Sequence, residues 1–339
     1  MSRNSTTGML LSVQYLRGIA ALMVVCHHSQ VPQAWLFSPF PDLTQFARGV
    51  DIFFVISGFI IFTAARDEKF LQFAKRRIIR IAPLYWFATV GFAALSIFHL
   101  VARPWSIEQL LQSMLFIPHI HPKSGEIWPY LVPGWTLNYE IFFYAVFALG
   151  IASGRVIAFT SITICTFVLA GLAFDPQQVG PLFYTRPIIL EFLAGMFIAR
   201  AYQRNVFRGA WIGLFPGFAL LFWTGEYRDF VVGSGAALIV VGALSLERKM
   251  PRLALLKLLG DASYSVYLFH LFAVTPMTMI WMLLPLQGWT QFLVVVFGNV
   301  IAGTLLGLFC YRFIERPLLR ALLRRPKPEP SLLTEAVIT

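Results

Sequence analysis

The stretch GVDIFFVISGFIIFTAARDEKFLQFAKRRIIRIAPLYW, residues 49–86, contains two kinds of segment. Residues 49–65 form an apolar run in which Asp51 is the single charged residue, and residues 75–80 read KRRIIR before a second apolar run begins. A run of roughly 20 apolar residues can cross a bilayer as a helix, and Lys and Arg gather on the cytoplasmic side. This stretch therefore predicts two membrane-spanning helices joined on the cytoplasmic side.

The composition of the whole chain agrees with a membrane protein. Of its 339 residues, 58% are hydrophobic and 13% are charged, and the mean hydropathy is +0.71. Soluble globular proteins have about 45–50% apolar and about 25% charged residues. The composition excludes a soluble enzyme, a nucleic-acid-binding protein and a disordered protein, and the net charge of +11 is attributed to cytoplasmic loops.

The hydropathy pattern predicts an all-α polytopic membrane protein of about ten transmembrane helices. The predicted spans cover residues 11–29, 49–65, 81–101, 133–151, 155–174, 186–202, 210–224, 229–246, 262–284 and 291–312. With both termini in the cytoplasm, 21 of the 27 Lys and Arg residues fall on the inner side. This bias predicts a multi-pass membrane protein with both termini in the cytoplasm.

The predicted domain plan is simple. Residues 1–10 form a cytoplasmic N-terminus, residues 11–320 the transmembrane domain, and residues 321–339 a cytoplasmic, disordered tail. The outer loop 102–132 contains a helix-like segment, 106–116, that is apolar on one face and is expected to be an interfacial or partly re-entrant element on the outer side. Three cysteines are far apart within apolar stretches and indicate neither a disulfide nor a metal site.

Ionisable residues are costly inside a membrane and require an explanation. His28, Asp51, Glu140 and Glu191 all fall in the outer halves of their predicted spans, which predicts a polar cavity open to the outer side. Asp51 is expected to orient the imidazole of His28, which would then serve as a general base. A purely structural His–Asp pair is the alternative explanation.

Basic residues mark the inner side. Arg17 precedes His28 by 11 residues, three helical turns plus roughly 20°, so the two share one face about 16 Å apart along the axis. Arg76, Arg77 and Arg80 precede the third predicted span. Arginines bind phosphate oxygens in bidentate fashion, so a phosphate clamp is one interpretation and a positive-inside anchor is the other. Arg17 either serves a donor that enters from the inside or pairs with an acid such as Asp261.

Aromatic and polar residues complete the candidate set. Trp135 comes five residues before Glu140 and is a candidate for stacking on a sugar. Tyr264, Tyr267 and His270 recur every three residues in the ninth predicted span and form a partly polar face. Acceptor binding and structural support are both compatible with that pattern.

Seven segments in this order resemble the acyltransferase 3 family of membrane acyltransferases. They are LRGIAALMVVCHHS (16–29), GVDIFFVISGFII (49–61), KRRIIRIAPLYW (75–86), WTLNYE (135–140), EFLAGM (191–196), GDASYSVYLFH (260–270) and IERP (314–317). The resemblance extends from about residue 10 to residue 320. The opening LSVQYLRGIAAL is most similar to exopolysaccharide O-acetyltransferases of the succinoglycan type.

The resemblance implies an enzyme that takes an acyl group, commonly acetyl, from cytoplasmic acyl-coenzyme A and passes it to a saccharide hydroxyl on the outer side. It implies that Arg17 and His28 are the hallmark pair, that Arg76, Arg77 and Arg80 hold the coenzyme A end, and that Asp51 belongs to the outer side. Because His27 precedes His28, the assignment of the histidine depends on spacing. Direct transfer and a covalent acyl-histidine are both open.

The expected partners are acyl-coenzyme A, a saccharide acceptor that can be lipid-linked, and membrane lipids, with no nucleic acid and no permanently bound cofactor or metal. Catalysis is assigned to His28, Asp51 and Glu140, with Glu140 positioning the sugar. Two other classes compete with the enzyme. One is a glycan transporter or flippase with a His/Asp/Glu proton relay, and the other is a membrane component that binds a ligand without turnover.

Overall fold

A computed structural model of the chain describes residues 10–30, 35–39, 44–65, 68–98, 106–122, 124–207 and 209–323. This part of the chain is all-helical, and its single β-bridge pairs Ile120 with Ile127. The structure therefore confirms the predicted all-α class. The expected cytoplasmic N-terminus lies outside the described residues except for residue 10, and so does nearly all of the expected tail.

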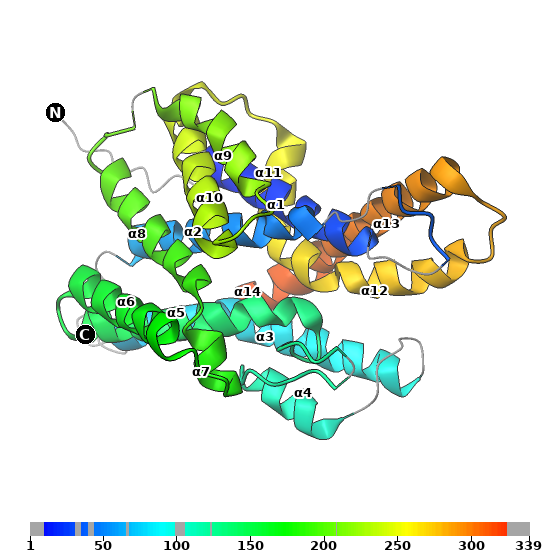
Figure 1. The fold of residues 1–339 in the computed structure, drawn as a ribbon, viewed down its shortest axis with the longest axis horizontal. Helices are drawn as coiled ribbons and strands as arrows, with labels where there is room; N and C mark the ends of the chain where they lie inside the picture. The colour runs from blue at the N-terminus through cyan, green and yellow to red at the C-terminus, as the bar shows by residue number, and fades with distance from the viewer. Residues whose placement is uncertain are drawn as a thin grey trace, which may run out of the picture.

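Within these described ranges, fourteen α-helices and several short helical turns follow one another (Figure 1). The α-helices are α1 (Leu11–Ser29), α2 (Gly49–Ala64), α3 (Phe70–Ile97), α4 (Ile107–Met114), α5 (Trp135–Ala152), α6 (Val156–Phe174), α7 (Val179–Tyr184), α8 (Leu190–Tyr202), α9 (Leu214–Leu221), α10 (Arg228–Ser245), α11 (Ala254–Asp261), α12 (Ser263–Trp281), α13 (Gly288–Cys310) and α14 (Arg316–Leu322). The turns are η1 (Thr44–Arg48), η2 (Val132–Gly134), η3 (Pro187–Ile189), η4 (Ala210–Gly213), η5 (Glu247–Lys249) and η6 (Tyr311–Glu315).

Six helical segments are long and apolar enough to cross a membrane: Thr44–Ala64, Phe70–Ile97, Val132–Ala152, Val156–Phe174, Arg228–Ser245 and Gly288–Leu322. The other four predicted spans contain helices that miss one of these criteria. Helices α8 and α9 are short, whereas α1 and α12 have 19 residues each but carry polar side chains along their length. Membrane character is thus clear, and on length and composition alone the structure supports six spans.

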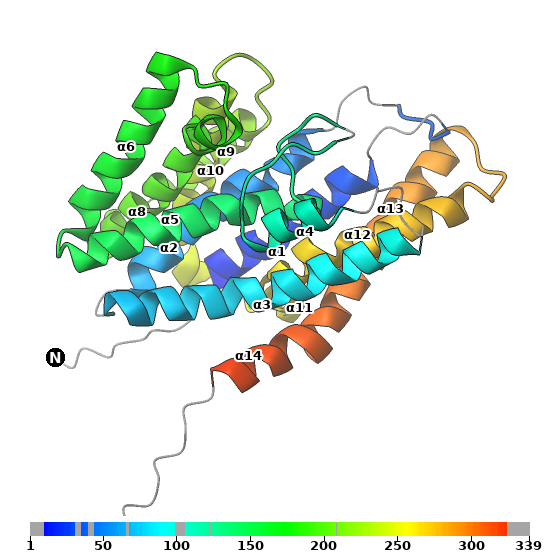
Figure 2. The ribbon, with the colours of Figure 1, turned by 90° about the horizontal axis from the view of Figure 1, so that it is seen from below.

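Helix α3 differs most from its predicted boundaries. It begins at Phe70, not near residue 81, and runs for 28 residues with Pro83 in its interior (Figure 2). Basic residues such as Arg77 are good helix formers, so the helix continues through the KRRIIR segment instead of starting after it. Arg76, Arg77 and Arg80 consequently stand on one continuous helix.

The core contains two large apolar clusters that meet at α2. One joins α3, α5 and α12 around residues such as Tyr85, Phe143 and Leu268, and the other joins α1, α8 and α10 around residues such as Val55 and Ile239. Helices α12 and α13 pack side by side, as do α2 and α8. Figures 1 and 2 show α2 between these groups of helices.

Glycines allow α2 and α8 to approach closely. A Cβ atom at Gly195 would lie 1.9 Å from the carbonyl oxygen of Val55, and one at Gly58 would lie 2.0 Å from that of Phe192. Neither position has room for a side chain. Small residues at such crossings bring two backbones into contact, and here they determine where the acidic residues of α2 and α8 meet.

Candidate functional site

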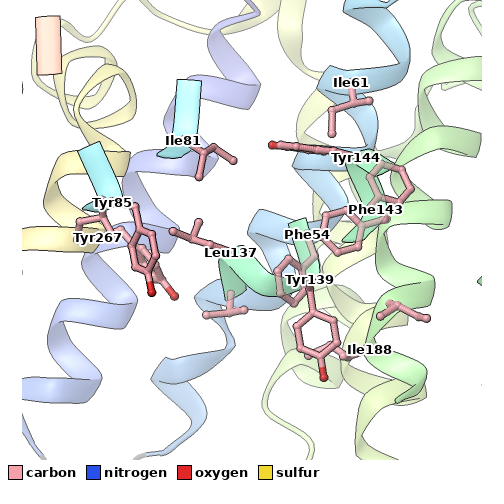
Figure 3. Packing of buried hydrophobic residues seen from close by; sticks show 14 of the residues in the cluster. Phe54, Ile61, Ile81, Tyr85, Leu137, Tyr139, Phe143, Tyr144, Ile188 and Tyr267 are labelled. Atoms are coloured by element: carbon pink, nitrogen blue, oxygen red, sulfur yellow. The ribbon is translucent and has the colours of Figure 1, made fainter. Parts of the chain in front are cut away.

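A cavity of about 150 Å³ lies inside the bundle, between α1, α2, α3, α5 and α12. Six of its lining residues are labelled in Figure 3: Phe54, Ile61, Ile81, Leu137, Tyr144 and Tyr267. Charged and hydroxyl groups also face it, namely Arg17, Ser57, Arg77, Arg80, Thr136, Glu140 and Tyr264. An apolar cavity with a few convergent polar groups is typical of a ligand site.

The cavity is elongated along α2. Its lining runs from Val50, in the first turn of that helix, to Ile61, near the last. Eleven residues at 1.5 Å each give about 16 Å. Arg77 and Arg80 of α3 line the same cavity as Thr136 of α5, so it connects the end that carries the arginines with the end at which α5 begins.

The arginines face the cavity unequally. Arg77 lies over the rings of Phe73 and Tyr144, 5.4 and 5.9 Å from their centroids, and its Nε is buried without a hydrogen-bond partner. Arg80 donates to the carboxylate of Glu315 at 2.7 Å. Arg17 lines the cavity and forms no ion pair with the described residues. Positive charge is therefore concentrated at one end.

Arg76 does not join this cluster. Its side chain is 47% exposed and pairs with Glu68. Around the helix axis Arg76 lies about 40° from Arg80 but about 100° from Arg77, so it stands at the edge of the face that Arg77 and Arg80 present to the cavity. Of the three arginines expected to form the clamp, Arg77 and Arg80 line the cavity together with Arg17 of α1, whereas Arg76 lies outside its lining and its role in donor binding stays a prediction.

Glu140 lies in the wall of the cavity and accepts two hydrogen bonds. The hydroxyl of Ser57 donates to its Oε1 at 2.8 Å, and the hydroxyl of Tyr144 donates to its Oε2 at 3.1 Å. The positive charges of Arg77 and Arg17 also act on this carboxylate. Glu140 thus belongs with the arginines and not with His28, contrary to the expected convergence of all four ionisable groups.

The two tyrosines of α12 have fixed hydroxyl groups. Tyr267 donates to the carbonyl of Pro133 at 2.8 Å and lies 2.9 Å from the hydroxyl of Thr136. Tyr264 donates to the carbonyl of Ile81 at 2.8 Å. Both rings line the cavity, so these residues shape its wall while they tie α12 to α3 and α5.

His28 lies beside His270, and the centroids of their rings are 4.8 Å apart. His28 Nδ1 is 3.0 Å from the carbonyl oxygen of Val24, and His270 Nδ1 is 3.2 Å from that of Val266. A carbonyl only accepts, so in each ring Nδ1 carries the proton and Nε2 carries the lone pair. The ring of Tyr267, which lines the cavity, is 6.4 Å from that of His270, whereas neither histidine is itself among the lining residues.

Asp51 does not orient His28. It is fully buried and accepts from Arg228 at 3.2 Å. The carboxyl group of Glu191, itself 3% exposed, lies next to it. Arg228 also donates to Asp229 at 2.7 Å. The tight packing of α2 on α8 brings the two buried acids together. Asp51 pairs with Arg228 and His28 contacts Val24 and His270, so the expected His28–Asp51 pair does not form.

Trp135 lies outside the cavity lining and its stacking on a sugar stays a prediction, whereas the expected pairing of Asp261 with Arg17 is corrected. Trp135 packs edge-on against Phe54 and Tyr139, with centroids 6.2 and 5.9 Å apart, and is not among the cavity-lining residues. Asp261 accepts from Lys257 at 2.7 Å, and this hydrogen bond raises the pKa of the Lys257 ammonium. Asp261 is thus paired with Lys257, four residues earlier on the same helix, and not with Arg17.

The sequence analysis missed several polar partners at the site. Ser57 and Tyr144 hold Glu140, Arg228 neutralises Asp51, and Glu315 holds Arg80. Glu315 belongs to the segment IERP (314–317) and Arg228 to the charged segment 225–229, so the sequence marked both residues as noteworthy. Ser57 and Tyr144 had none, because a hydroxyl in an apolar helix is unremarkable until its partner is known.

Comparison with known proteins agrees with this architecture. The acyltransferase domain family model of acyltransferase 3 proteins matches residues 10–308. The exopolysaccharide production protein ExoZ of Rhizobium meliloti (strain 1021) is 41% identical over 298 residues, which cover 81% of this chain and 90% of ExoZ.

Two more distant relatives also match. Nodulation protein 10 of Rhizobium leguminosarum bv. viciae is 24% identical over 80% of this chain and 84% of its own. The acyltransferase MdmB of Streptomyces mycarofaciens is 31% identical over 41% of this chain and 38% of its own. No solved structure matches. The family match covers nearly the whole helical bundle, and the chain belongs to the acyltransferase 3 family.

Proposed function

We propose that the protein is an integral-membrane O-acetyltransferase that moves an acetyl group from cytoplasmic acetyl-coenzyme A, its donor substrate, to a hydroxyl of an exopolysaccharide or another cell-surface glycan on the outer side. Family membership and the similarity to an exopolysaccharide production protein support the reaction class and the acceptor class. The protein would reside in the bacterial inner membrane with ten crossing segments and both termini in the cytoplasm.

The observation that carries the proposal is the elongated cavity. Arg17, Arg77 and Arg80 lie at one end, and the wall at Tyr267 adjoins the histidine pair. Phosphates cannot enter hydrocarbon, whereas the arm that carries a thioester is thin and only moderately polar. Arginines at the cytoplasmic end would hold the phosphates while the arm extends into the cavity.

The transfer step uses His28 as a general base. Its Nε2 lone pair takes the proton of the acceptor hydroxyl, and the hydroxyl oxygen bonds to the carbonyl carbon of the thioester. The carbon–sulfur bond then breaks, and the thiolate leaves and takes up a proton. Glu140 would serve on the donor side of the site, where it balances Arg17 and Arg77; Asp51 and Glu191 would support the outer end of α2 and α8.

The test is release of free thiol from acetyl-coenzyme A by the purified protein in nanodiscs, with and without a lipid-linked saccharide extract. We expect saccharide-dependent release by the wild type and by His27→Ala, and loss of about 10²–10⁴-fold in His28→Ala. His27 is the matched control, because it is the adjacent histidine on the same helix.

Two results would count against the proposal. Thiol release that is equal in His28→Ala and the wild type would remove His28 from the chemistry. Absence of both acetyl-coenzyme A binding and thiol release would reject the acetyltransferase and leave the glycan transporter as the better explanation.

A further inference from the structure

A second cavity, of about 370 Å³, opens at the end of the molecule where α1 begins. Gln14 and Arg17 of α1, Arg80 of α3, and Glu315, Arg316 and Arg320 of the C-terminal segment line it. Arg17 and Arg80 also line the first cavity, so the two cavities share a wall. Figure 2 shows α14, which carries Arg316 and Arg320, projecting from the bundle beyond α13.

The second cavity has unneutralised positive charge. Two carboxylates line it, those of Asp261 and Glu315, and both have partners already. Asp261 accepts from Lys257, and Glu315 accepts from Arg80 and, at 2.6 Å, from Ser265. Arg316 and Arg320 form no ion pair with any described residue. They are four residues apart on a continuous helix and therefore lie on one face. Guanidinium groups so placed are suited to phosphate oxygens.

Gln14 independently indicates a ligand. Its side chain is 6% exposed, and its Oε1 has no hydrogen-bond partner. A buried amide oxygen without a donor is uncommon and costs free energy. Because Gln14 lines the cavity, an N–H group of a bound molecule would satisfy it.

A π-helical turn, η6, positions the acidic member of the site. It spans Tyr311–Glu315, and Glu315 is 1% exposed. Single π-turns occur frequently at functional sites because the extra residue redirects the side chains around it. Here it places the Glu315 carboxylate against Arg80, in the wall between the two cavities.

We propose that the second cavity binds the phosphorylated nucleotide end of the donor, with Arg316 and Arg320 on its phosphates and Gln14 on an N–H group. The Arg80–Glu315 ion pair then acts as a gate. The incoming phosphate opens it by competing with Glu315 for Arg80. This inference rests on the proposed function, since one extended donor would occupy both cavities. The shared chemistry is a phosphate ester, which an anionic lipid headgroup could also supply.

The experiment uses the full-length protein in phosphatidylcholine nanodiscs and the double variant Arg316→Gln/Arg320→Gln. Arg312→Gln is the matched control, because it removes charge from the same segment at an exposed position that does not line the cavity. We measure binding of acetyl-coenzyme A and adenosine 3′,5′-bisphosphate, and turnover of acetyl-pantetheine, which lacks phosphates.

The double variant should bind both nucleotides about tenfold more weakly, as expected for a lost charge-assisted hydrogen bond. The double variant should turn over acetyl-pantetheine within about twofold of the wild-type rate. Arg312→Gln should bind the nucleotides within about twofold of the wild-type affinity. Glu315→Gln, which keeps the shape of the side chain, should bind the bisphosphate several-fold more tightly because the competing carboxylate is gone.

Unchanged nucleotide binding in the double variant of an otherwise active protein would overturn this proposal and leave the acetyltransferase intact. An equal loss in Arg312→Gln would do the same, because it would show an effect of net charge alone. If phosphatidylglycerol stabilises the wild type but not the double variant, and nucleotides bind both equally, the cavity is a lipid site. A wild type that neither binds nor turns over acetyl-coenzyme A would reject the proposed function as well.

Discussion

His28 and His270 face each other from α1 and α12 with ring centroids 4.8 Å apart. The backbone oxygens of Val24 and Val266 hold their Nδ1 atoms, so each ring has its lone pair on Nε2. His270 Nε2 is buried without a partner. The pair thus offers two acceptors close together. The sequence analysis assigned catalysis to His28, and it assigned His270 to acceptor binding or structural support.

Substitution of His270 distinguishes these two acceptors. His270→Phe preserves an aromatic ring against His28 and removes Nε2. If His28 is the base, the kcat of His270→Phe should fall by about tenfold or less, with KM for acetyl-coenzyme A unchanged. The kcat of His28→Ala should fall by about 10²–10⁴-fold. Steady-state kinetics of thiol release measures both. A larger loss in His270→Phe than in His28→Ala would make His270 the base.

Removal of the guanidinium at position 228 should destabilise the fold. Arg228 pairs with the fully buried Asp51 at 3.2 Å, although its own side chain is 37% exposed. Allowing for that exposure, we expect Arg228→Gln to cost about 1–2 kcal/mol, since Asp51 would lose its charged donor. Unfolding in mixed detergent micelles measures the change. Arg186→Gln, at a half-exposed pair of 3.8 Å, should cost less than about 0.5 kcal/mol.

The close crossing of α2 and α8 should not tolerate a side chain at position 195. In Gly195→Ala the new Cβ would lie 1.9 Å from the Val55 carbonyl oxygen, so the helices must separate. We expect strongly reduced accumulation of folded protein in membranes, measured by fluorescence-detected size-exclusion chromatography. Gly180→Ala, where no atom lies within 4 Å of the added Cβ, should behave like the wild type. Normal yield of Gly195→Ala would contradict the described packing.

The hydroxyl of Ser57 should matter more than other hydroxyls on its helix. It donates to Glu140 at 2.8 Å from a different helix, so Ser57→Ala leaves a buried carboxylate oxygen without its donor. We expect a cost of about 1.5–3 kcal/mol in the same unfolding assay. Thr63→Ala removes a hydroxyl of α2 that donates to the carbonyl of Phe59 in that same helix, and it should be nearly neutral. Equal costs would indicate that Glu140 does not depend on Ser57.

Several features of the protein were determined by the sequence alone. Apolar run length and amphipathic patterning depend only on local sequence, so they identified a helical membrane protein and the amphipathic helix α4 (Ile107–Met114). The ordered motifs identified the family. Arg17 and His28 share a face because helical rotation relates them within a single helix, α1.

Only the tertiary structure decided which polar groups meet. Membrane depth suggested that His28, Asp51 and Glu140 converge, but equal depth does not specify which helices are neighbours. The glycine-lined crossing of α2 and α8 places Asp51 beside Glu191, and rotation of α3 directs Arg77 into the cavity while Arg76 stays outside. The pair formed by Arg80 and Glu315 spans 235 residues of sequence, and such long-range contacts arise from helix packing, which local sequence does not encode.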